Sequence, residues 1–260
     1  MKKIPLVSII MNCHNGELFL EKSLNSIFLQ TYKNWELIFW DNKSKDNSKK
    51  IVNKFKDNRI KYYYSNKYNS LYKSRNLAIK KARGKYITFL DTDDLWHKEK
   101  IKKQINYVIK NNVKVCCTNF YVLNEKKGKR KKFIQENKKI VTTQNLLKRY
   151  DLGILTILID KNLLKKNLFN TKYEIIGDFD FFTNLSLSHD IGFLNKTLAT
   201  YRMHDRNLSL KRIDLHIKEL ESWIRSNSAM LKKKKISIKE QKFYLMKLKI
   251  KKGLNFYKYF

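Results

Sequence analysis

The 260-residue sequence predicts an α/β fold in which helices flank both faces of a mostly parallel sheet. Between residues 4 and about 120, short runs rich in β-branched and aromatic residues alternate with segments whose apolar residues recur at helical spacing. The strongest strand candidates also end in polar turns. Strand–helix–strand units of this kind give parallel strands, and ligands then bind beyond the carboxyl ends of those strands.

Each element of the first half is recognised from a local pattern. Five short apolar or aromatic runs predict strands, at 7–11, 35–40, 60–64, 86–90 and 113–120. Four segments with one apolar face predict helices, which begin near Glu17, Ile51, Leu71 and Trp96. Gly84 is suited to end the third of these helices.

The chain after residue 120 shows fewer regular patterns. The Lys-rich stretch 126–132 is expected to be a solvated loop, and the segment 141–209 is mixed. From residue 211 onward the chain is helical and rich in Lys. We therefore expect a main domain over 1–210, with halves at about 1–120 and 121–210, and a basic helical extension over 211–260.

The net charge of the chain indicates which kinds of partner it can bind. It carries 57 Lys and Arg against 23 Asp and Glu, a formal net charge of +34. Such a charge suits a phosphate-rich partner. No basic-aromatic module of the kind that reads bases is visible, so no nucleic acid is expected. An anionic membrane surface attracts the same charge, and we favour that partner.

The apolar runs and the cysteines indicate the cellular compartment of the protein. The longest apolar runs, 6–11 and 152–159, are far shorter than the ~20 residues of a membrane span. No cleavage site follows the basic N-terminus. Cys13, Cys116 and Cys117 match neither a disulfide framework nor zinc-site spacing. We expect a cytoplasmic protein, in peripheral contact with the inner face of the cytoplasmic membrane.

The basic extension contains apolar residues that could form an interfacial helix among the lysines. The alternative is an ordinary helix that packs on the main domain and exposes a solvated Lys face. The apolar residues concerned are Trp223, Ile224, Phe243, Tyr244, Leu245, Phe256, Tyr257, Tyr259 and Phe260.

An acidic cluster ends the strand candidate at 86–90. Asp91 and Asp93 point to the same side of an extended strand end, because the side-chain period is two. Carboxylates so placed suit Mg²⁺ or Mn²⁺, together with substrate phosphates. The alternative is an Asp-rich cap on the helix near Trp96. The position at a buried strand end favours the metal for Asp91 and Asp93, whereas Asp94 is expected at the start of that helix.

Asp41 ends the strand candidate at 35–40 and precedes Ser44 and Asp46. Its carboxylate is suited to accept a hydrogen bond from the N3–H of a uracil or from ribose hydroxyls. The alternative is turn chemistry, which favours Asp, Asn and Ser at such positions.

The chain contains the stretches PLVSIIMNCHNGELFLEKSLNSIFLQTYKNWELIFWDNKSKDNS, SRNLAIKKARGKYITFLDTDD, EIIGDFDFF and YRMHDRNLS. Together these stretches resemble the family 2 glycosyltransferases, which have the GT-A fold. The resemblance covers roughly residues 4–209 and implies a GT-A (Rossmann-like) catalytic domain with a nucleotide-binding half and an acceptor-binding half. It implies an inverting enzyme that moves a sugar from a nucleotide diphosphate, by resemblance UDP, to the hydroxyl of a glycan or lipid-linked acceptor in cell-surface glycan synthesis.

The resemblance also implies roles for single residues. Asp93 would be the principal ligand of Mg²⁺ or Mn²⁺, and Asp178 would be the catalytic base. Asp91 would reach the ribose or the metal. His204 would approach the metal or the diphosphate, with a packed or surface histidine as its alternative. The nucleotide-binding residues would be Asn12, His14, Asn15, Glu17, Asp41, Arg75 and Asp91.

The sequence departs from the family pattern at two places. Gly177 stands where the family has Glu before the base, and Asp180, two residues after Asp178, is an alternative base. The first motif reads Asn-Cys-His-Asn where Pro-x-Tyr-Asn is common, which bears on the nucleoside contacts of Cys13 and His14.

Two other functions compete with glycosyl transfer. A nucleotidyltransferase would be expected to carry a Gly-rich phosphate loop after its first strand, whereas residues 12–16 contain one Gly. A non-enzymatic module that binds nucleic acid or membrane would explain the charge. Such a module has no use for Asp91, Asp93 and Asp178 in family order.

Overall fold

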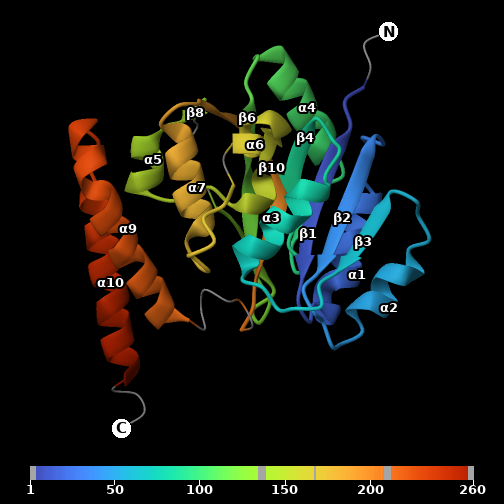
Figure 1. Cartoon of the computed structure of the whole chain (residues 1–260), viewed down its shortest axis with the longest axis horizontal. Helices are drawn as coiled ribbons and strands as arrows, with labels where there is room; N and C mark the ends of the chain where they lie inside the picture. The colour runs from blue at the N-terminus through green and yellow to red at the C-terminus, as the bar shows by residue number, and fades with distance from the viewer. Residues whose placement is uncertain (1–3, 134–138, 167, 206, 208–211, 257–260) are drawn as a thin grey trace.

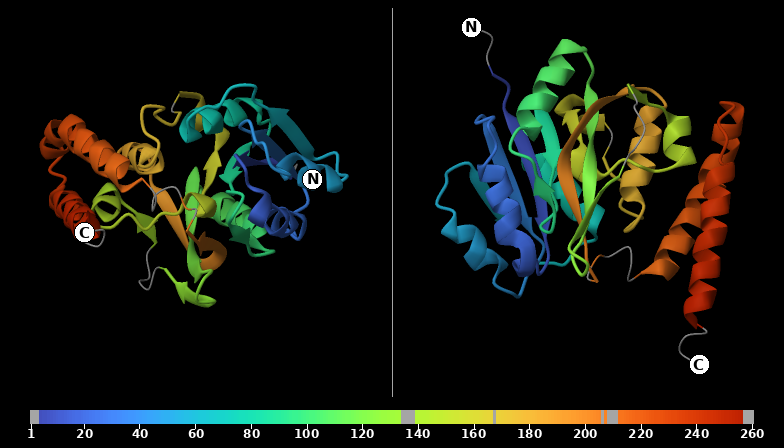
Figure 2. Two further views of the ribbon diagram at one scale, coloured as in Figure 1. Left: turned by 90° about the horizontal axis from the view of Figure 1, so that it is seen from below. Right: turned by 180° about the vertical axis from the view of Figure 1, so that it is seen from behind.

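A computed structural model describes residues 4–133, 139–166, 168–205, 207 and 212–256. One mixed sheet lies at the centre with helices on both faces, and two long C-terminal helices pack beside it (Figures 1 and 2). The strands are β1 (Val7–Cys13), β2 (Trp35–Asp41), β3 (Ile60–Tyr64), β4 (Tyr86–Phe89), β5 (Leu95–Trp96), β6 (Val115–Asn124), β7 (Lys129–Lys132), β8 (Ile140–Val141), β9 (Leu158–Asp160) and β10 (Ile191–Met203). The helices are α1 (Glu17–Phe28), α2 (Ser48–Lys54), α3 (Leu71–Lys81), α4 (Lys100–Lys110), α5 (Thr143–Lys148), α6 (Lys161–Lys166), α7 (Gly177–Ser186), α9 (Ile213–Lys233) and α10 (Lys239–Phe256), with a 3₁₀ helix η1 (Ile154–Thr156).

The predicted α/β class is confirmed, and the sheet has two parts. Its strand order is β3-β2-β1-β4-β9-β6-β10-β5, with β7 paired to β6 and β8 to β10. The first four strands of that order run parallel. In the second part β6 and β10 are parallel, whereas β9 runs antiparallel to both β4 and β6. The β1, β2 and β4 strands therefore end at the same edge, as the pattern of the first half predicts.

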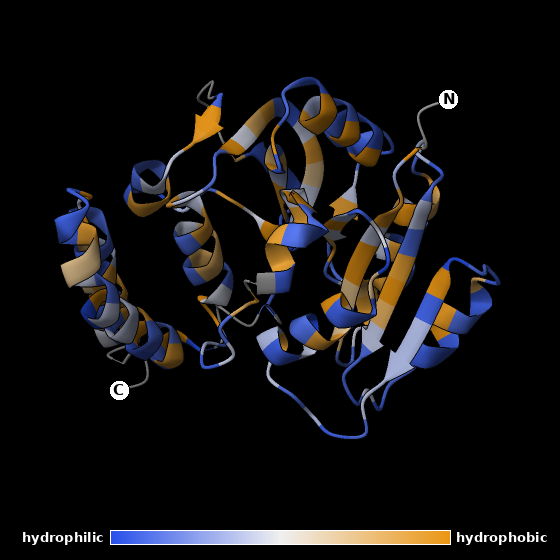
Figure 3. Ribbon diagram, turned by 45° about the horizontal axis from the view of Figure 1, so that its top comes forward, coloured by the Kyte–Doolittle hydropathy of each residue, from blue (hydrophilic) through white to orange (hydrophobic). Residues whose placement is uncertain are grey.

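The helices divide between the two faces of the sheet. One core contains buried residues of α1, α2 and α4, and the other contains residues of α3, α5, α6 and α7. Along β1, Ile9 and Met11 point into the first core and Ile10 points into the second. Because both faces are covered, the strands read as continuous apolar runs, and Figure 3 shows the central strands mostly in the hydrophobic colour.

Two local predictions around the acidic cluster are wrong. Residues near Trp96 form β5 rather than the start of a helix, and α4 begins only at Lys100. The indole of Trp96 donates to the Leu155 carbonyl at 2.8 Å, and the strand pairs with β10. Asp94 is buried, and Glu99 is the N-cap of α4, so Asp94 does not start that helix.

Two more predictions need correction. The stretch 126–132 is not simply a loop, because β7 folds back on β6 as a hairpin whose turn includes Gly128 at φ +59°. Gly84 does not end α3, which is capped by Ala82. Gly84 instead lets the chain approach β1 closely, since a Cβ there would lie 2.6 Å from the Ser8 nitrogen.

The C-terminal extension is helical, as expected, but two of the apolar residues named for an interfacial helix, Trp223 and Ile224, are buried. Trp223 and Ile224 belong to a third core that joins α9 and α10 to Phe179 of α7 and Leu147 of α5. They are therefore not part of an interfacial surface. The expected boundary between residues 210 and 211 lies outside the described residues, as do Tyr257, Tyr259 and Phe260, and nothing is described of the Phe256 side chain.

Among the described residues, no helix combines the length and the apolar character needed to cross a bilayer.

Candidate active site

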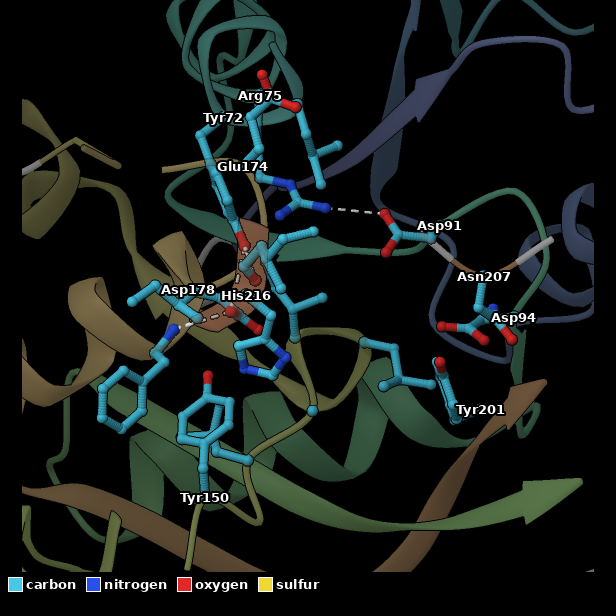
Figure 4. Close-up of a pocket in the computed structure, with 18 of the residues that line it drawn as sticks. Tyr72, Arg75, Asp91, Asp94, Tyr150, Glu174, Asp178, Tyr201, Asn207 and His216 are labelled. Atoms are coloured by element: carbon cyan, nitrogen blue, oxygen red, sulfur yellow. Dashed lines mark hydrogen bonds and ion pairs between the residues drawn. The ribbon is translucent and has the colours of Figure 1, made fainter. Parts of the chain in front are cut away.

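A cleft of about 1080 Å³ runs across the carboxyl edge of the sheet. One end is lined by strand-end residues such as Asn12, Asp91 and Asp93. The other end is lined by Asp178 of α7 and by residues of α9 and α10. The cleft therefore brings together carboxylates that lie more than 80 positions apart in the chain, and Figure 4 shows both groups in one view.

Asp91 and Arg75 form an ion pair on the wall between the two ends. The Arg75 guanidinium donates to Asp91 Oδ1 at 2.9 Å (Figure 4). Arg75 is buried, and its guanidinium lies between 5.4 and 5.9 Å from the ring centres of Tyr72, Phe89 and Phe169. A guanidinium held in this way is fixed in position, and so is the carboxylate that it binds.

Asp93 is paired with His204, far away in the chain. His204 Nε2 lies 2.9 Å from Asp93 Oδ2, and the amide of Asn207 lies 3.4 Å from the same oxygen. Burial and the neighbouring Asp91 carboxylate raise the pKa of Asp93, whereas His204 opposes this rise. A cation next to Asp93 would relieve the unfavourable burial of its charge. Arg206, Leu208 and Ser209 of the same motif lie outside the described residues.

These residues fit a divalent cation that also binds the phosphates of a substrate. The described residues contain no cluster of three or more His, Cys, Asp and Glu placed to enclose a metal by themselves. Asp93 and His204 supply one oxygen and one nitrogen within 2.9 Å of each other. One or two protein ligands suffice when diphosphate oxygens and water complete the coordination, as is usual for Mg²⁺. Arg75 engages Oδ1 of Asp91, so Asp91 would join them through its other oxygen.

Asp94 and Arg202 form the support under this cluster. Asp94 Oδ1 accepts the backbone N–H of Arg202 at 2.9 Å, and Arg202 Nε donates to the Asp93 carbonyl at 2.8 Å. Arg202 also pairs with Glu125 at 2.6 Å and stacks on Phe19. These contacts join β10 to the acidic turn. They also hold the guanidinium of Arg202, which is not part of the cleft lining.

Of the expected nucleoside contacts, Asn12 and His14 line the cleft. The amide atoms of Asn12 are buried, and they have no hydrogen-bond partner within the described part of the chain. His14 Nδ1 lies 2.9 Å from the Asn42 carbonyl, and its ring packs edge-on against Tyr68 at 4.7 Å. Tyr68 and Asn42 also line the cleft, and the sequence pattern did not indicate either of them.

Three other expected nucleotide contacts lie outside the cleft lining. Asp41 is buried, where its oxygens accept hydrogen bonds from the Ser44 nitrogen at 2.7 Å and the Tyr62 hydroxyl at 2.6 Å. Asn15 and Glu17 bond the turn that follows β2, at Lys45 and Asn47. In this structure the three side chains shape the loops around the pocket, and direct ligand contact by them stays a prediction.

Asp178 stands at the other end of the cleft, among aromatic side chains. The Tyr72 hydroxyl donates to Asp178 Oδ1 at 3.2 Å, and the Tyr150 hydroxyl is also directed toward this carboxylate (Figure 4). Burial raises the pKa of Asp178, while the Arg75 charge and the hydroxyls of Tyr72 and Tyr150 act in the opposite direction. A carboxylate with a raised pKa in a cleft has the properties of a general base.

Gly177 explains how Tyr72 reaches Asp178. A Cβ at position 177 would lie 2.4 Å from the Tyr72 ring, so the ring fills the space that a side chain there would need. The glycine that replaces the family's Glu at position 177 thus leaves room for Tyr72, whose hydroxyl contacts Asp178. Asp180 has a different place, because it accepts from the Trp223 indole at 2.9 Å and from Asn184 at 3.1 Å and is outside the cleft lining.

The extension completes this end of the site, which the sequence did not indicate. His216 of α9 and Tyr244 of α10 line the cleft, and their rings lie 5.8 Å apart. Glu219 of α9 accepts the backbone N–H groups of Glu174, Ile175 and Ile176, at 2.7 to 3.1 Å. These are the residues just before α7, so α9 holds the segment that positions Asp178.

Known proteins share both the sequence and this fold. The chain is 34% identical over 208 residues to the Escherichia coli UDP-Glc:alpha-D-GlcNAc-diphosphoundecaprenol beta-1,3-glucosyltransferase WfgD, covering 78% of this chain and 79% of WfgD. It is 29% identical over 214 residues to the putative teichuronic acid biosynthesis glycosyltransferase TuaG of Bacillus subtilis, covering 79% and 82% of the two chains.

Solved structures agree with the fold. The crystal structure of S. aureus TarS 1-349 in complex with UDP superimposes with a TM-score of 0.65 at 23% identity, over 82% of this chain and 65% of TarS 1-349. The mannosyltransferase PcManGT of Pyrobaculum calidifontis, in complex with GDP-Man and Mn2+, gives a TM-score of 0.65 at 15% identity, over 86% and 65% of the chains. The model of the family described as "Glycosyl transferase family 2" matches residues 8–180, from the first strand to the carboxylates of α7, and the chain belongs to this family of glycosyltransferases.

Proposed function

We propose that this enzyme transfers a sugar from a UDP-sugar to a hydroxyl group of a lipid-linked glycan acceptor, with inversion at the anomeric carbon. The observation that carries the proposal is the single cleft with Asp91 and Asp93 at one end and Asp178 at the other. Family membership sets aside the nucleotidyltransferase and the non-enzymatic module. The lipid-linked acceptor and the UDP-sugar are supported by the printed activity of WfgD, and UDP also by the TarS complex.

The nucleotide end would bind the donor. Asn12 lines this end, and the ring of Tyr68 beside His14 offers an apolar surface to a base. Asp93 with His204 would hold Mg²⁺ or Mn²⁺, which supplies positive charge to the diphosphate as it leaves. Arg75 keeps Asp91 oriented next to this position.

The other end would activate the acceptor. Asp178 accepts the proton of the acceptor hydroxyl while the hydroxyl oxygen forms its bond to the anomeric carbon. The bond between that carbon and the diphosphate breaks in the same displacement, and its electron pair leaves with the nucleoside diphosphate. Attack opposite to the leaving group inverts the anomeric centre. Tyr72 holds the carboxylate in place through its hydrogen bond to Oδ1.

The test is a panel of UDP-, GDP-, CMP- and dTDP-sugars with Mn²⁺ or Mg²⁺ and a lipid-linked acceptor. We expect turnover with a UDP-sugar, which chelation of the metal abolishes. Asp93→Ala is expected to lower the rate by about 10²–10³-fold, because charge on the leaving group then lacks its partner. Asp57→Ala, in a partly buried pair with Arg59 outside the cleft lining, is the matched control. Turnover that is the same in Asp93→Ala and Asp57→Ala would contradict the assignment.

A further inference from the structure

The last helix of the structure, α10, exposes a stripe of large apolar side chains. Phe243, Met246, Ile250 and Leu254 are between 48% and 62% exposed. Their spacing of three, four and four residues puts them on one side of the helix. We call these four residues the α10 stripe. A helix of a water-soluble domain normally turns such a side toward a core, so this stripe needs a partner.

Most of the stripe faces away from the rest of the protein, since Phe243 is the one stripe residue that also lines the cleft. The opposite side of α10 is the packed one, where Gln241 and Leu248 are buried. Lys249 pairs with Glu221 and Lys252 pairs with Asp214, and both acidic residues belong to α9. Figures 1 and 2 show the α9–α10 pair at the edge of the molecule opposite to β3. The stripe is therefore free to meet a partner without any rearrangement of the core.

The charge around the stripe identifies the chemistry of that partner. Lys242, Lys247 and Lys251 are exposed on the same helix, and the whole chain has a net charge of +34. An apolar stripe flanked by lysines is complementary to a bilayer, whose acyl region accepts the apolar side chains and whose anionic headgroups attract the lysines.

The same helix also lines the cleft. Tyr244 and Lys247 of α10 line the end that holds Asp178, and Phe243 belongs to both the stripe and the lining. Lys148 and Arg149 add two more cationic side chains to this lining. Three cationic side chains in the cleft lining, next to an apolar stripe, suit a ligand with a sugar, a diphosphate and a lipid chain, in this order.

We propose that α10 seats the enzyme on an anionic membrane through the α10 stripe, and that Lys148, Arg149 and Lys247 receive the diphosphate of a lipid-linked acceptor. This inference rests on the proposed function, since it requires an acceptor that stays in the bilayer. The sugar of the acceptor then reaches Asp178, while the lipid chain remains among the membrane lipids beside the stripe.

Vesicle binding tests the membrane contact. The full chain is sedimented with vesicles of phosphatidylcholine alone or of phosphatidylcholine with phosphatidylglycerol. We expect binding to the anionic vesicles that weakens with added salt. The triple variant Met246→Gln, Ile250→Gln, Leu254→Gln changes no cleft residue and is expected to bind at least about tenfold more weakly. The matched control, Ile4→Gln, Leu29→Gln, Ile109→Gln, changes exposed apolar residues elsewhere and should bind as the parent does.

Equal binding by the parent and the triple variant, or no binding by the parent, would overturn the membrane contact. Equal losses in the triple variant and its control would overturn it too, because the stripe would then have no special role. Melting curves establish that both variants fold. A variant that loses self-association or a protein partner, yet still binds vesicles normally, also counts against the proposal.

Transfer assays separate this inference from the proposed function. With a water-soluble acceptor that bears a short alkyl diphosphate, the triple variant should match the parent, whereas with a lipid-linked acceptor in vesicles it should be slower by about tenfold or more. Lys247→Gln should raise the KM for both acceptors and leave the KM for the donor unchanged, with Lys102→Gln on α4 as control. No transfer to any acceptor would overturn the proposed function, whereas transfer that ignores the stripe and Lys247 would overturn only the inference.

Discussion

The two ends of the cleft are built in different ways. The nucleotide end uses turns that directly follow β1, β2 and β4, three neighbouring parallel strands. The acceptor end uses α7, the segment around Tyr150, one turn of α3 and the two helices of the extension. The first end needs only strands that finish at a common edge. The second depends on contacts such as those of Glu219 with residues 174–176, which join distant parts of the chain.

The difference also appears in the roles of the acidic residues. At the nucleotide end, Asp41 is buried outside the cleft lining and is bonded by its neighbours, whereas Asp94, which is also buried and bonded by the protein, belongs to the lining. At the acceptor end, Asp180 has the supporting role and Asp178 lines the cleft. The role of an aspartate in a motif therefore has to be assigned from its contacts, because one aspartate can line the cleft while its neighbour in the motif only bonds the surrounding protein. The following predictions test this contrast.

The largest effect is expected for Asp178→Asn, which keeps the shape of the side chain and removes its basicity. Transfer should fall by about 10²–10⁴-fold. Stability should not fall, because burial raises the pKa of Asp178 and the ionised carboxylate therefore costs folding free energy above that pKa. Transfer by the parent should likewise decline as the pH drops through the raised pKa. Rate assays and thermal melts check both statements.

Asp180→Asn is the matched control, since an amide oxygen can still accept from the Trp223 indole. Its transfer rate should stay within about tenfold of the parent, well short of the loss expected for a general base. A larger loss in Asp180→Asn than in Asp178→Asn would exchange the two roles.

The next largest effect is expected at Lys100, and it is an effect on the stability of the sheet beneath the nucleotide end. Its ammonium is buried against Trp96 and donates to Thr88 Oγ1 at 3.0 Å, and burial lowers the pKa of Lys100 to about 7. Between pH 7 and 10.5 the Lys100 side chain is protonated in the unfolded chain and largely neutral in the folded one. The free energy of unfolding therefore rises with pH across this range and falls as the pH is lowered toward 7.

Lys100→Met is expected to raise the free energy of unfolding at pH 7 by about 1–4 kcal/mol and to flatten this pH dependence. The measurement is urea unfolding at pH 7 and pH 9. Lys102→Met, at an exposed position of the same helix, should change neither quantity much. A loss of stability in Lys100→Met at pH 7 would mean that the polar contacts of the ammonium outweigh its burial.

Gly177→Ala tests the close contact at the acceptor end. The new methyl group would meet the Tyr72 ring, so we expect about 1–3 kcal/mol of destabilisation and slower transfer as Tyr72 moves from Asp178. Gly253→Ala in α10 meets nothing within 4 Å and should stabilise the helix by up to about 1 kcal/mol. Stabilisation of equal size in both variants would disprove the contact.

Glu219→Gln tests how far the extension supports the site. The two carboxylate oxygens of Glu219 accept three backbone N–H groups, and the amide of Gln has only one oxygen to accept them. The free energy of unfolding should therefore fall by about 1–3 kcal/mol. The transfer rate should fall with it, since the segment before α7 positions Asp178. Glu221→Gln, two residues further along α9 in a pair with Lys249, should change the free energy of unfolding much less. Equal effects would show that α9 is a passive neighbour.

The sequence by itself determined the fold class and the order of the first strands, because alternating periodicities and strand-end polar turns are local signals. It also indicated Asp91 and Asp93, since position at a strand end is local information. Beyond the resemblance, it did not indicate Tyr68, Tyr72, Tyr150 or His216, which carry no pattern of their own. Only the tertiary structure decided that they line the cleft.

The tertiary structure also decided which apolar residues of the extension are buried. Both Trp223 and Ile250 lie at helical spacing among lysines, and the sequence treats them alike. Trp223 is fully buried against α7, whereas Ile250 is 53% exposed on α10. Periodicity shows that a helix has an apolar side, but the direction of that side depends on how the helix docks. That docking is set by contacts between α7, α9 and α10, which no local window of sequence contains.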